Sequence, residues 1–91
     1  MIWLKYRDFG IVINIRDKAF IKAFGANLKR IRVGKGLSQE DLAYAADIPI
    51  NQIGRIERGE VNTTISTILA ISHALKIHYK QLMDFEYKSK S

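Results

Sequence analysis

Side chains that can hydrogen-bond to nucleic-acid bases gather in a short stretch near the middle of the chain. Asn51 and Arg55 lie four residues apart, and Ile53 and Ile56 repeat beside them at the spacing of one helix face. A short helix here would bury the isoleucines and turn the amide and guanidinium groups outward. Asn pairs with adenine N6 and N7, Arg pairs with guanine O6 and N7, and an apolar side chain can contact a thymine methyl group. The outward side chains Ile50, Asn51, Gln52 and Arg55 therefore suit base reading in a DNA major groove, although the same pattern taken alone is more typical of a polar surface helix.

Two short helices around a tight turn would position this reading face. Ser38 is a good N-cap for the first helix, and Asp41 three residues later can act as the acid of a capping box. Asp47 tolerates the left-handed conformation of a turn, and the fixed φ of Pro49 suits the first turn of the second helix. Gly59 is placed to cap the end of that helix.

The segments Leu-Ser-Gln-Glu-Asp-Leu-Ala at 37–43 and Ile-Gly-Arg-Ile-Glu-Arg-Gly at 53–59 resemble the helix-turn-helix of the XRE family of phage-repressor-like bacterial regulators. The resemblance runs from about residue 20 to residue 85. It implies an all-α, five-helix DNA-binding domain, and it favours base reading by the outward residues of the second helix over a polar surface helix. It also implies a sequence-specific transcriptional regulator, such as a repressor, that binds a pseudo-palindromic operator on double-stranded DNA as a homodimer. Two reading helices would then enter successive major grooves about 34 Å apart.

The resemblance also implies individual roles. Arg32 is expected to pair with Glu57 and to lock the first helix to the reading helix. Gln39 corresponds to a residue that contacts the DNA backbone, and the loop after the reading helix corresponds to one that seats a phosphate. The phosphate contacts expected from this chain are Gln39, Lys29, Arg58, Asn62 and Thr63.

Several positions depart from the family pattern. Asp47 replaces the usual turn glycine, at a cost of about 1 kcal/mol. Pro49 stands where Ser or Thr usually caps the reading helix, so the start of the helix could differ from the family register by one residue. Gly54 removes a side chain midway, which would let the backbone approach the groove. Glu60 stands where the family often has Lys or Arg, which weakens the expected phosphate contacts of the loop.

The charge distribution favours a polyanionic partner. The 91 residues carry a net charge of +6 and a pI of about 9.8. Residues 17–37 carry a net charge of +5, whereas residues 38–59 carry −2. Phosphate attraction is therefore expected mainly from the first helix, where Lys29, Arg30 and Lys35 face outward, and base reading from another element.

The chain length allows one domain. Residues 1–16 are interpreted as an irregular or β-like N-terminal extension, residues 17–85 as the DNA-binding domain and residues 86–91 as a polar tail. The domain would begin with a helix capped by Asp17 and end with a short helix over residues 78–83, in which Leu82 and Met83 close the core. Leu82, Met83 and Phe85 are also candidates for a dimer contact. The helix before it would have a wide apolar face made of Ile65, Ile68, Leu69, Ile71, Ala74 and Leu75.

Other classes of protein find little support. The chain has no cysteine, and its longest apolar run is too short to span a bilayer, so we expect a cytoplasmic protein with no membrane segment. No nucleophile–base–acid set, metal cluster or phosphate loop stands out, so we expect no enzyme activity, cofactor or metal site. Two alternatives keep the same fold. One is an antitoxin with a toxin as its protein partner, or the controller of a restriction–modification operon. The other is a protein-binding adaptor that has lost DNA reading.

Overall fold

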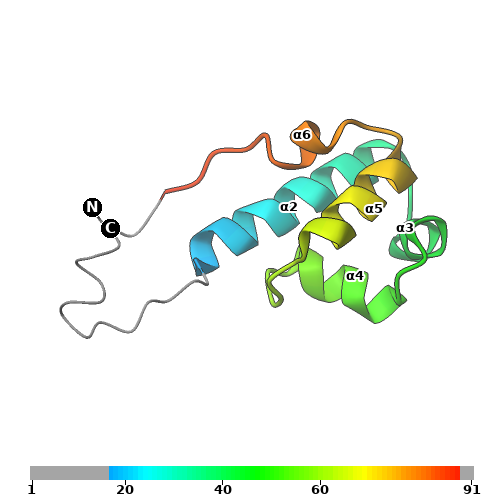
Figure 1. Ribbon diagram of the computed structural model, residues 1–91, viewed down its shortest axis with the longest axis horizontal. Coiled ribbons are helices and arrows are strands. Elements are labelled where there is room, and N and C mark those ends of the chain that lie inside the picture. The colour runs from blue at the N-terminus through cyan, green and yellow to red at the C-terminus, as the bar shows by residue number, and fades with distance from the viewer. Residues whose placement is uncertain (1–16, 89–91) are drawn as a thin grey trace.

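A computed structural model describes residues 17–88 of the chain, and this part is all-helical with five helices (Figure 1). In chain order they are α2 Lys18–Gly34, α3 Gln39–Ala46, α4 Ile50–Glu57, α5 Ile65–Leu75 and α6 Tyr79–Leu82. The predicted all-α, five-helix architecture is confirmed. The extension at 1–16 and residues 89–91 of the polar tail lie outside the described residues.

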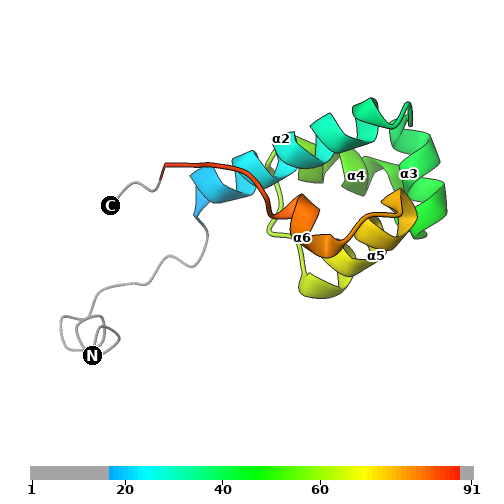
Figure 2. The same cartoon turned by 90° about the horizontal axis from the view of Figure 1, so that it is seen from above.

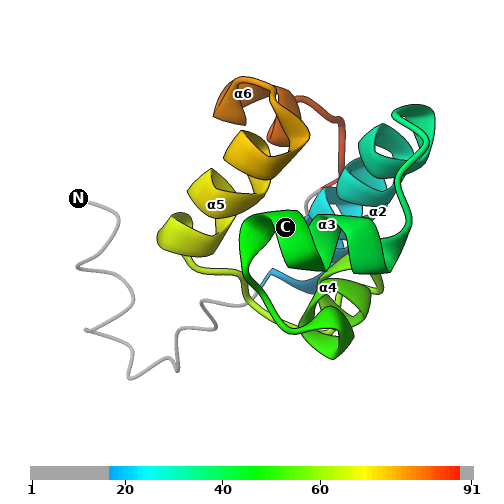
Figure 3. The ribbon, with the colours of Figure 1, turned by 90° about the vertical axis from the view of Figure 1, so that its right-hand side faces the viewer.

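The long helix α2 runs between α6 on one side and α4 on the other (Figures 1 and 3). Helix α2 packs against both of them, α3 packs against α4 and α5, and α6 packs against α5 as well as α2 (Figure 2). This arrangement leaves one side of α4 uncovered by the other helices.

Short polar side chains begin the helices α2, α3 and α5, as the sequence indicates. Asp17 accepts a hydrogen bond from the Phe20 amide at 3.0 Å. Ser38 and Asp41 form the predicted capping box, in which each side chain accepts from the other residue's amide. The Ser38 amide, which donates to the Asp41 carboxylate, lowers the pKa of Asp41, and the Ser38 side chain adds to this effect. Thr64 caps α5 by accepting from the Thr67 amide.

Two turns use the left-handed conformation without glycine. Asp47 ends α3 with φ 57°, as predicted, and Lys76 ends α5 with φ 58°. A non-glycine residue pays about 1 kcal/mol or more for this conformation. At Asp47 the turn allows the Ile48 amide to bond the Ala43 carbonyl at 3.0 Å, and the Ile48 side chain packs against the core. The tight connection between α3 and α4 follows from that bond.

One apolar core joins all five described helices. It is made of Phe24, Leu28, Leu42, Ala43, Ile53, Ile56, Ile71, Leu75 and Leu82. The apolar face of α5 is present but only partly buried, because Ile65 and Leu69 expose 85% and 44% of their surfaces whereas Ile71 and Leu75 are buried. Two expectations about the edge of the core were wrong. Met83 is exposed rather than part of the core. Leu82 is fully buried within the chain and is therefore no candidate for a dimer contact.

A buried asparagine that the sequence analysis did not single out attaches α6 to α2. The Asn27 side-chain amide donates to the carbonyls of Gln81 and Leu82 at 3.0 and 2.9 Å. Arg30 donates in turn to the Asn27 side-chain oxygen. Helix α6 has only one turn, and these bonds bring its last carbonyls to the long helix.

A glycine sets the distance between α2 and α4. A Cβ built on Gly25 would lie 2.7 Å from the Glu57 carbonyl oxygen and nearer still to that of Ile56. Both neighbours are backbone atoms and have little room to move. Gly25→Ala should therefore push α2 and α4 apart and lower the free energy of unfolding by about 1–3 kcal/mol, as overpacked cores do. Urea unfolding followed by circular dichroism measures it.

Gly34→Ala is the matched control, because a Cβ there meets no atom within 4 Å. Alanine favours a helix over glycine, so this variant should be as stable as the unmodified chain or gain up to about 1 kcal/mol. Equal urea midpoints for the two variants would show that the close approach at Gly25 does not limit packing.

Candidate nucleic-acid interface

A buried ion pair joins α2 to α4. The Arg32 Nε donates to Glu57 Oε2 at 2.6 Å, and Arg32 Nη2 donates to Glu57 Oε1 at 3.0 Å. The guanidinium therefore binds the carboxylate in a bidentate manner, with two parallel hydrogen bonds. The third nitrogen, Nη1, donates to the Leu37 carbonyl at 2.7 Å. Both side chains are buried, and the Glu57 carboxylate raises the pKa of Arg32. The pairing that the family resemblance implies is present with bidentate geometry.

Gln39 extends this network to α3. Its side-chain amide donates to Glu57 Oε1 at 3.0 Å. The carboxylate of Glu57 thus receives hydrogen bonds from α2 and α3 while it stands at the end of α4. Sequence reasoning assigned Gln39 to the DNA backbone and missed this bond. The observed contact fixes Gln39 against the reading helix, at the edge of its exposed face.

The reading residues share the exposed side of α4. Ile53 and Ile56 are buried, as predicted, while Ile50, Asn51 and Arg55 are exposed. A shallow hollow of about 290 Å³ is lined by Pro49, Asn51, Gln52, Arg55 and Val61. Two amides and one guanidinium therefore border a single concave surface.

Pro49 lies at the N-cap position with φ −56° and ψ 140°, where the family pattern places the cap, and no side chain caps the helix. Its fixed φ therefore precedes the first turn of α4 rather than lying within it. The connection between α3 and α4 thus consists of the left-handed turn at Asp47 followed by the extended backbone of Pro49, after which α4 begins. Gly54 is buried rather than open to the groove. A Cβ on Gly54 would lie 3.0 Å from Arg58 Nη1 and 3.6 Å from Gln39 Oε1, so the glycine makes room for these two side chains.

The cations of α2 divide between its two sides. Lys22 contacts the end of the reading helix, because a Cβ on Gly59 would lie 2.8 Å from the Lys22 Cα. Lys29 is exposed and follows Gly25 by four residues, so it lies on the side of α2 that faces α4. Arg30 bonds to Asn27, which places it on the side of α6. Lys22 and Lys29 therefore lie on the α4 side of α2, whereas Arg30 lies on the α6 side.

An acidic residue, Glu60, stands beside Arg55 of α4 and Arg58, the C-cap of that helix. Arg58 donates through Nε and Nη2 to the Glu60 carboxylate at 2.8 and 3.3 Å. Arg55 Nε lies 3.8 Å from the same carboxylate. The arginines lower the pKa of Glu60, chiefly through the Arg58 hydrogen bond. Sequence reasoning noted the unusual charge at 60 but not its partners. Arg58 and Glu60 are two residues apart at the end of a helix, and this spacing matches no helix or strand periodicity that would reveal the pair from the sequence.

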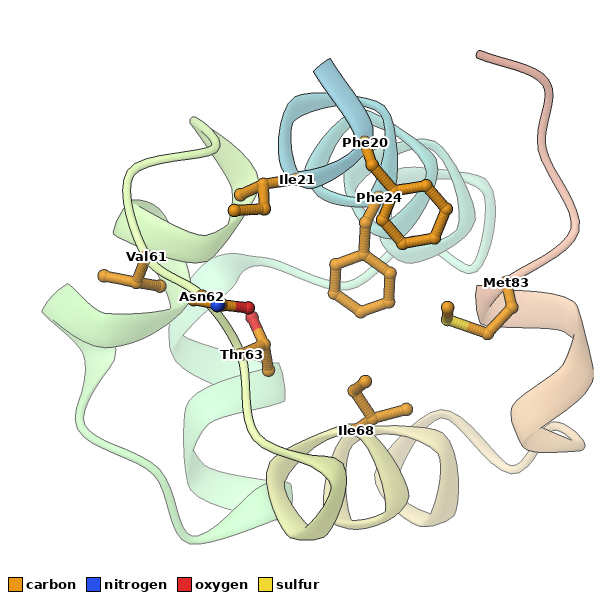
Figure 4. A pocket seen from close by; sticks show the side chains of 8 residues that line it. All are labelled: Phe20, Ile21, Phe24, Val61, Asn62, Thr63, Ile68 and Met83. Atoms are coloured by element: carbon orange, nitrogen blue, oxygen red, sulfur yellow. The ribbon is translucent and has the colours of Figure 1, made fainter. Parts of the chain in front are cut away.

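The loop after α4 carries the other phosphate candidates. Asn62 is exposed and Thr63 is partly buried. With Val61 they border a small, mostly apolar hollow of about 50 Å³ whose other side is formed by Phe20, Phe24, Ile68 and Met83 (Figure 4). Asn62 and Thr63 thus lie near the start of α2, at one end of the interface. Tyr44 on α3 is 91% exposed and takes no part in the core.

Within residues 17–88 no cluster of three or more His, Cys, Asp or Glu side chains could hold a metal ion. No helix in the same range is long and apolar enough to span a membrane.

Comparisons with known proteins agree with this geometry. Residues 28–82 match the family model described as Helix-turn-helix. The chain is 41% identical over 63 residues to the control protein C.BamHI of Bacillus amyloliquefaciens, an alignment that covers 68% of this chain and 78% of that protein. It superposes on the restriction–modification controller protein C.AhdI of Aeromonas hydrophila with a TM-score of 0.66 at 38% identity, covering 69% of this chain and 94% of the other. The clp gene regulator ClgR of Corynebacterium glutamicum gives a TM-score of 0.68 at 25% identity, covering 70% and 83%.

Removing one partner of the buried ion pair should be costly. Glu57→Gln leaves the Arg32 guanidinium buried without a countercharge, and we expect it to lower the free energy of unfolding by about 3–5 kcal/mol. Replacing both partners, with Arg32→Met and Glu57→Leu together, should recover most of that loss because no buried charge remains. Urea midpoints of the single and double variants test this. A double variant no more stable than Glu57→Gln would contradict the charge-balance explanation.

Proposed function

This chain belongs to the Helix-turn-helix family, and from that membership we propose that it is a sequence-specific DNA-binding transcriptional regulator acting as a homodimer. One observation carries the proposal. Helix α4 buries Ile53 and Ile56, is fixed by the Arg32–Glu57 pair, and presents Asn51 and Arg55 on its exposed side. A rigidly held helix with an amide and a guanidinium outward suits the donor and acceptor pattern of a major groove.

In the proposed complex α4 enters the major groove. Arg55 pairs with a guanine, Asn51 pairs with an adenine, and Ile50 contacts a thymine methyl group, with Gln52 beside them over the hollow. The flanking phosphates are bound by Gln39, Lys29, Arg58, Asn62 and Thr63. The mechanism is steric, since a protein seated on an operator blocks the promoter that overlaps it. Phosphate contacts make the affinity fall with rising salt.

The proposed homodimer has a candidate contact surface on α5 and α6. Ile65, Leu69 and Tyr79 expose 85%, 44% and 50% of their surfaces, and with Ile68 they line an apolar hollow of about 230 Å³. A second copy is the occupant we propose, because a pseudo-palindromic operator requires two reading helices related by a two-fold axis. The surface lies on other helices than α4, so pairing there leaves both reading faces open.

A narrower version of this function is control of a restriction–modification operon. It is supported by the likeness to the controller protein C.AhdI at 38% identity. Genes for a restriction endonuclease and a methyltransferase beside this gene would support it. A toxin gene in the same place would favour the antitoxin alternative.

Selection of binding sites from a random duplex pool tests the proposed function. The purified chain should enrich a two-fold symmetric consensus, and the complex should contain two copies of the chain. Binding that depends on salt but enriches no consensus would overturn the proposal and favour an adaptor role.

Arg55→Ala should affect one base position in the selected consensus. Losing a bidentate contact to guanine should weaken binding to that duplex by about 1–3 kcal/mol and relax the preference at one position in each half-site. Lys29→Ala is the comparison, because a lost phosphate contact should weaken all duplexes alike. Fluorescence anisotropy with the consensus and single-base variants measures both. Unchanged consensus affinity for Arg55→Ala would mean that the reading face is wrongly assigned.

Ile65→Glu should separate the proposed dimer. A carboxylate on the apolar surface of α5 would have to be buried without a partner, which disfavours association. Sedimentation equilibrium should report monomers at concentrations where the unmodified chain is dimeric. Val33→Glu makes the same substitution at an exposed position on α2 and should leave the dimer intact. Dimers that persist in Ile65→Glu would exclude this surface.

A further inference from the structure

The turn after the reading helix fixes the backbone of an acidic residue, Glu60. Gly59, with φ +75°, donates its amide to the Ile56 carbonyl at 3.0 Å, and the Glu60 amide donates to the Arg55 carbonyl at 2.9 Å. These two bonds form a Schellman motif, which closes the helix through its last carbonyls. The backbone of Glu60 is therefore attached to α4, and its side chain contacts Arg55 and Arg58 at the end of that helix.

The Glu60 carboxylate contacts both Arg55 in the helix and Arg58 at its C-cap. Arg58 binds it with two hydrogen bonds, through Nε and Nη2. Arg55 approaches it through Nε, at 3.8 Å. A guanine takes both terminal amino groups of an arginine, and the approach through Nε leaves these groups for a base. The contact with Glu60 is thus compatible with base reading by Arg55 and helps to orient it.

The ion pairs contribute little to the stability of the fold. About half of each side chain's surface is exposed, at 47% for Glu60, 55% for Arg55 and 58% for Arg58. Exposed pairs of this kind open easily. A DNA phosphate presents the same anionic oxygens to Arg58 that Glu60 does, so the two compete for it. Any duplex that approaches α4 meets an arginine already neutralised and a carboxylate that repels phosphate.

We propose that Glu60 is a specificity-determining residue that weakens binding to non-cognate DNA while it positions Arg55 for its base. Non-cognate binding depends on phosphates alone, so the carboxylate opposes it fully. Cognate binding also gains the Arg55 contact that Glu60 helps to orient, which offsets the repulsion. The inference rests on the proposed function and adds the residue that sets the ratio between the two affinities.

Glu60→Gln tests this role, because it removes the charge and keeps the size. Affinities are measured for the duplex selected with the unmodified chain and for a shuffled duplex of equal composition, over a range of salt concentrations. On shuffled DNA we expect binding to tighten roughly three- to tenfold and the salt slope to steepen by about 0.9, the value for one added phosphate contact. On the selected duplex the affinity should stay unchanged or fall, so the ratio of the two affinities decreases.

Two further variants isolate the cause. Glu86→Gln removes the same charge from the exposed segment after α6, across α2 from the reading helix, and should leave the ratio unchanged (Figure 1). Arg58→Ala combined with Glu60→Gln should lose the extra affinity for shuffled DNA, because the arginine released by the single substitution is absent.

The outcomes separate this proposal from the function on which it rests. If the unmodified chain discriminates between the two duplexes and Glu60→Gln keeps the same ratio, the role of Glu60 is wrong and the regulator function stands. If the unmodified chain binds both duplexes equally, the proposed function fails, and the role of Glu60 fails with it.

Discussion

The two parallel hydrogen bonds between Arg32 and Glu57 are the constraint on which the interface depends. Glu57 ends α4, Arg32 lies in the last turn of α2, and the same guanidinium also holds the Leu37 carbonyl that leads into α3. Three helices therefore meet at one buried carboxylate. Short helices of eight residues are marginal by themselves, so their orientation must come from such tertiary contacts.

In this interface, most of the positive charge and the side chains suited to base reading lie on different helices. Residues 17–37 carry most of the positive charge, yet the side chains suited to base edges lie on α4, in a segment that is net acidic. Close contact at Gly25 joins the two elements backbone to backbone. Because that contact has little slack, cations on the α4 side of α2, such as Lys29, keep a fixed offset from the reading face. The cations of α2 that are expected to attract phosphates and the side chains of α4 that are expected to read bases are thus held in one rigid unit.

Local signals predicted most of the fold. Asp17, Ser38 with Asp41, and Asp47 act where the sequence indicates, because a cap or a left-handed turn is decided by neighbouring residues. Errors and omissions arose where the packing of side chains in space decides. Gly54 is small because Gln39 and Arg58 cover it, and Asn27 is buried because α6 returns across α2. The Glu60 pairs depend on the turn at Gly59, which a residue pattern alone does not place in space. The DNA contacts themselves remain predictions.

The side chains on the exposed side of α4 are not the ones that fix the helix to the rest of the fold. Asn51 and Arg55 lie outside the core cluster and outside the Arg32–Glu57 network, whereas Ile53 and Ile56 belong to the core. Substitutions on the exposed side can therefore accumulate with little loss of stability. In evolutionary terms the scaffold tolerates drift of its target site: protein and operator can change together by single steps, and the fold need not be rebuilt for each new sequence.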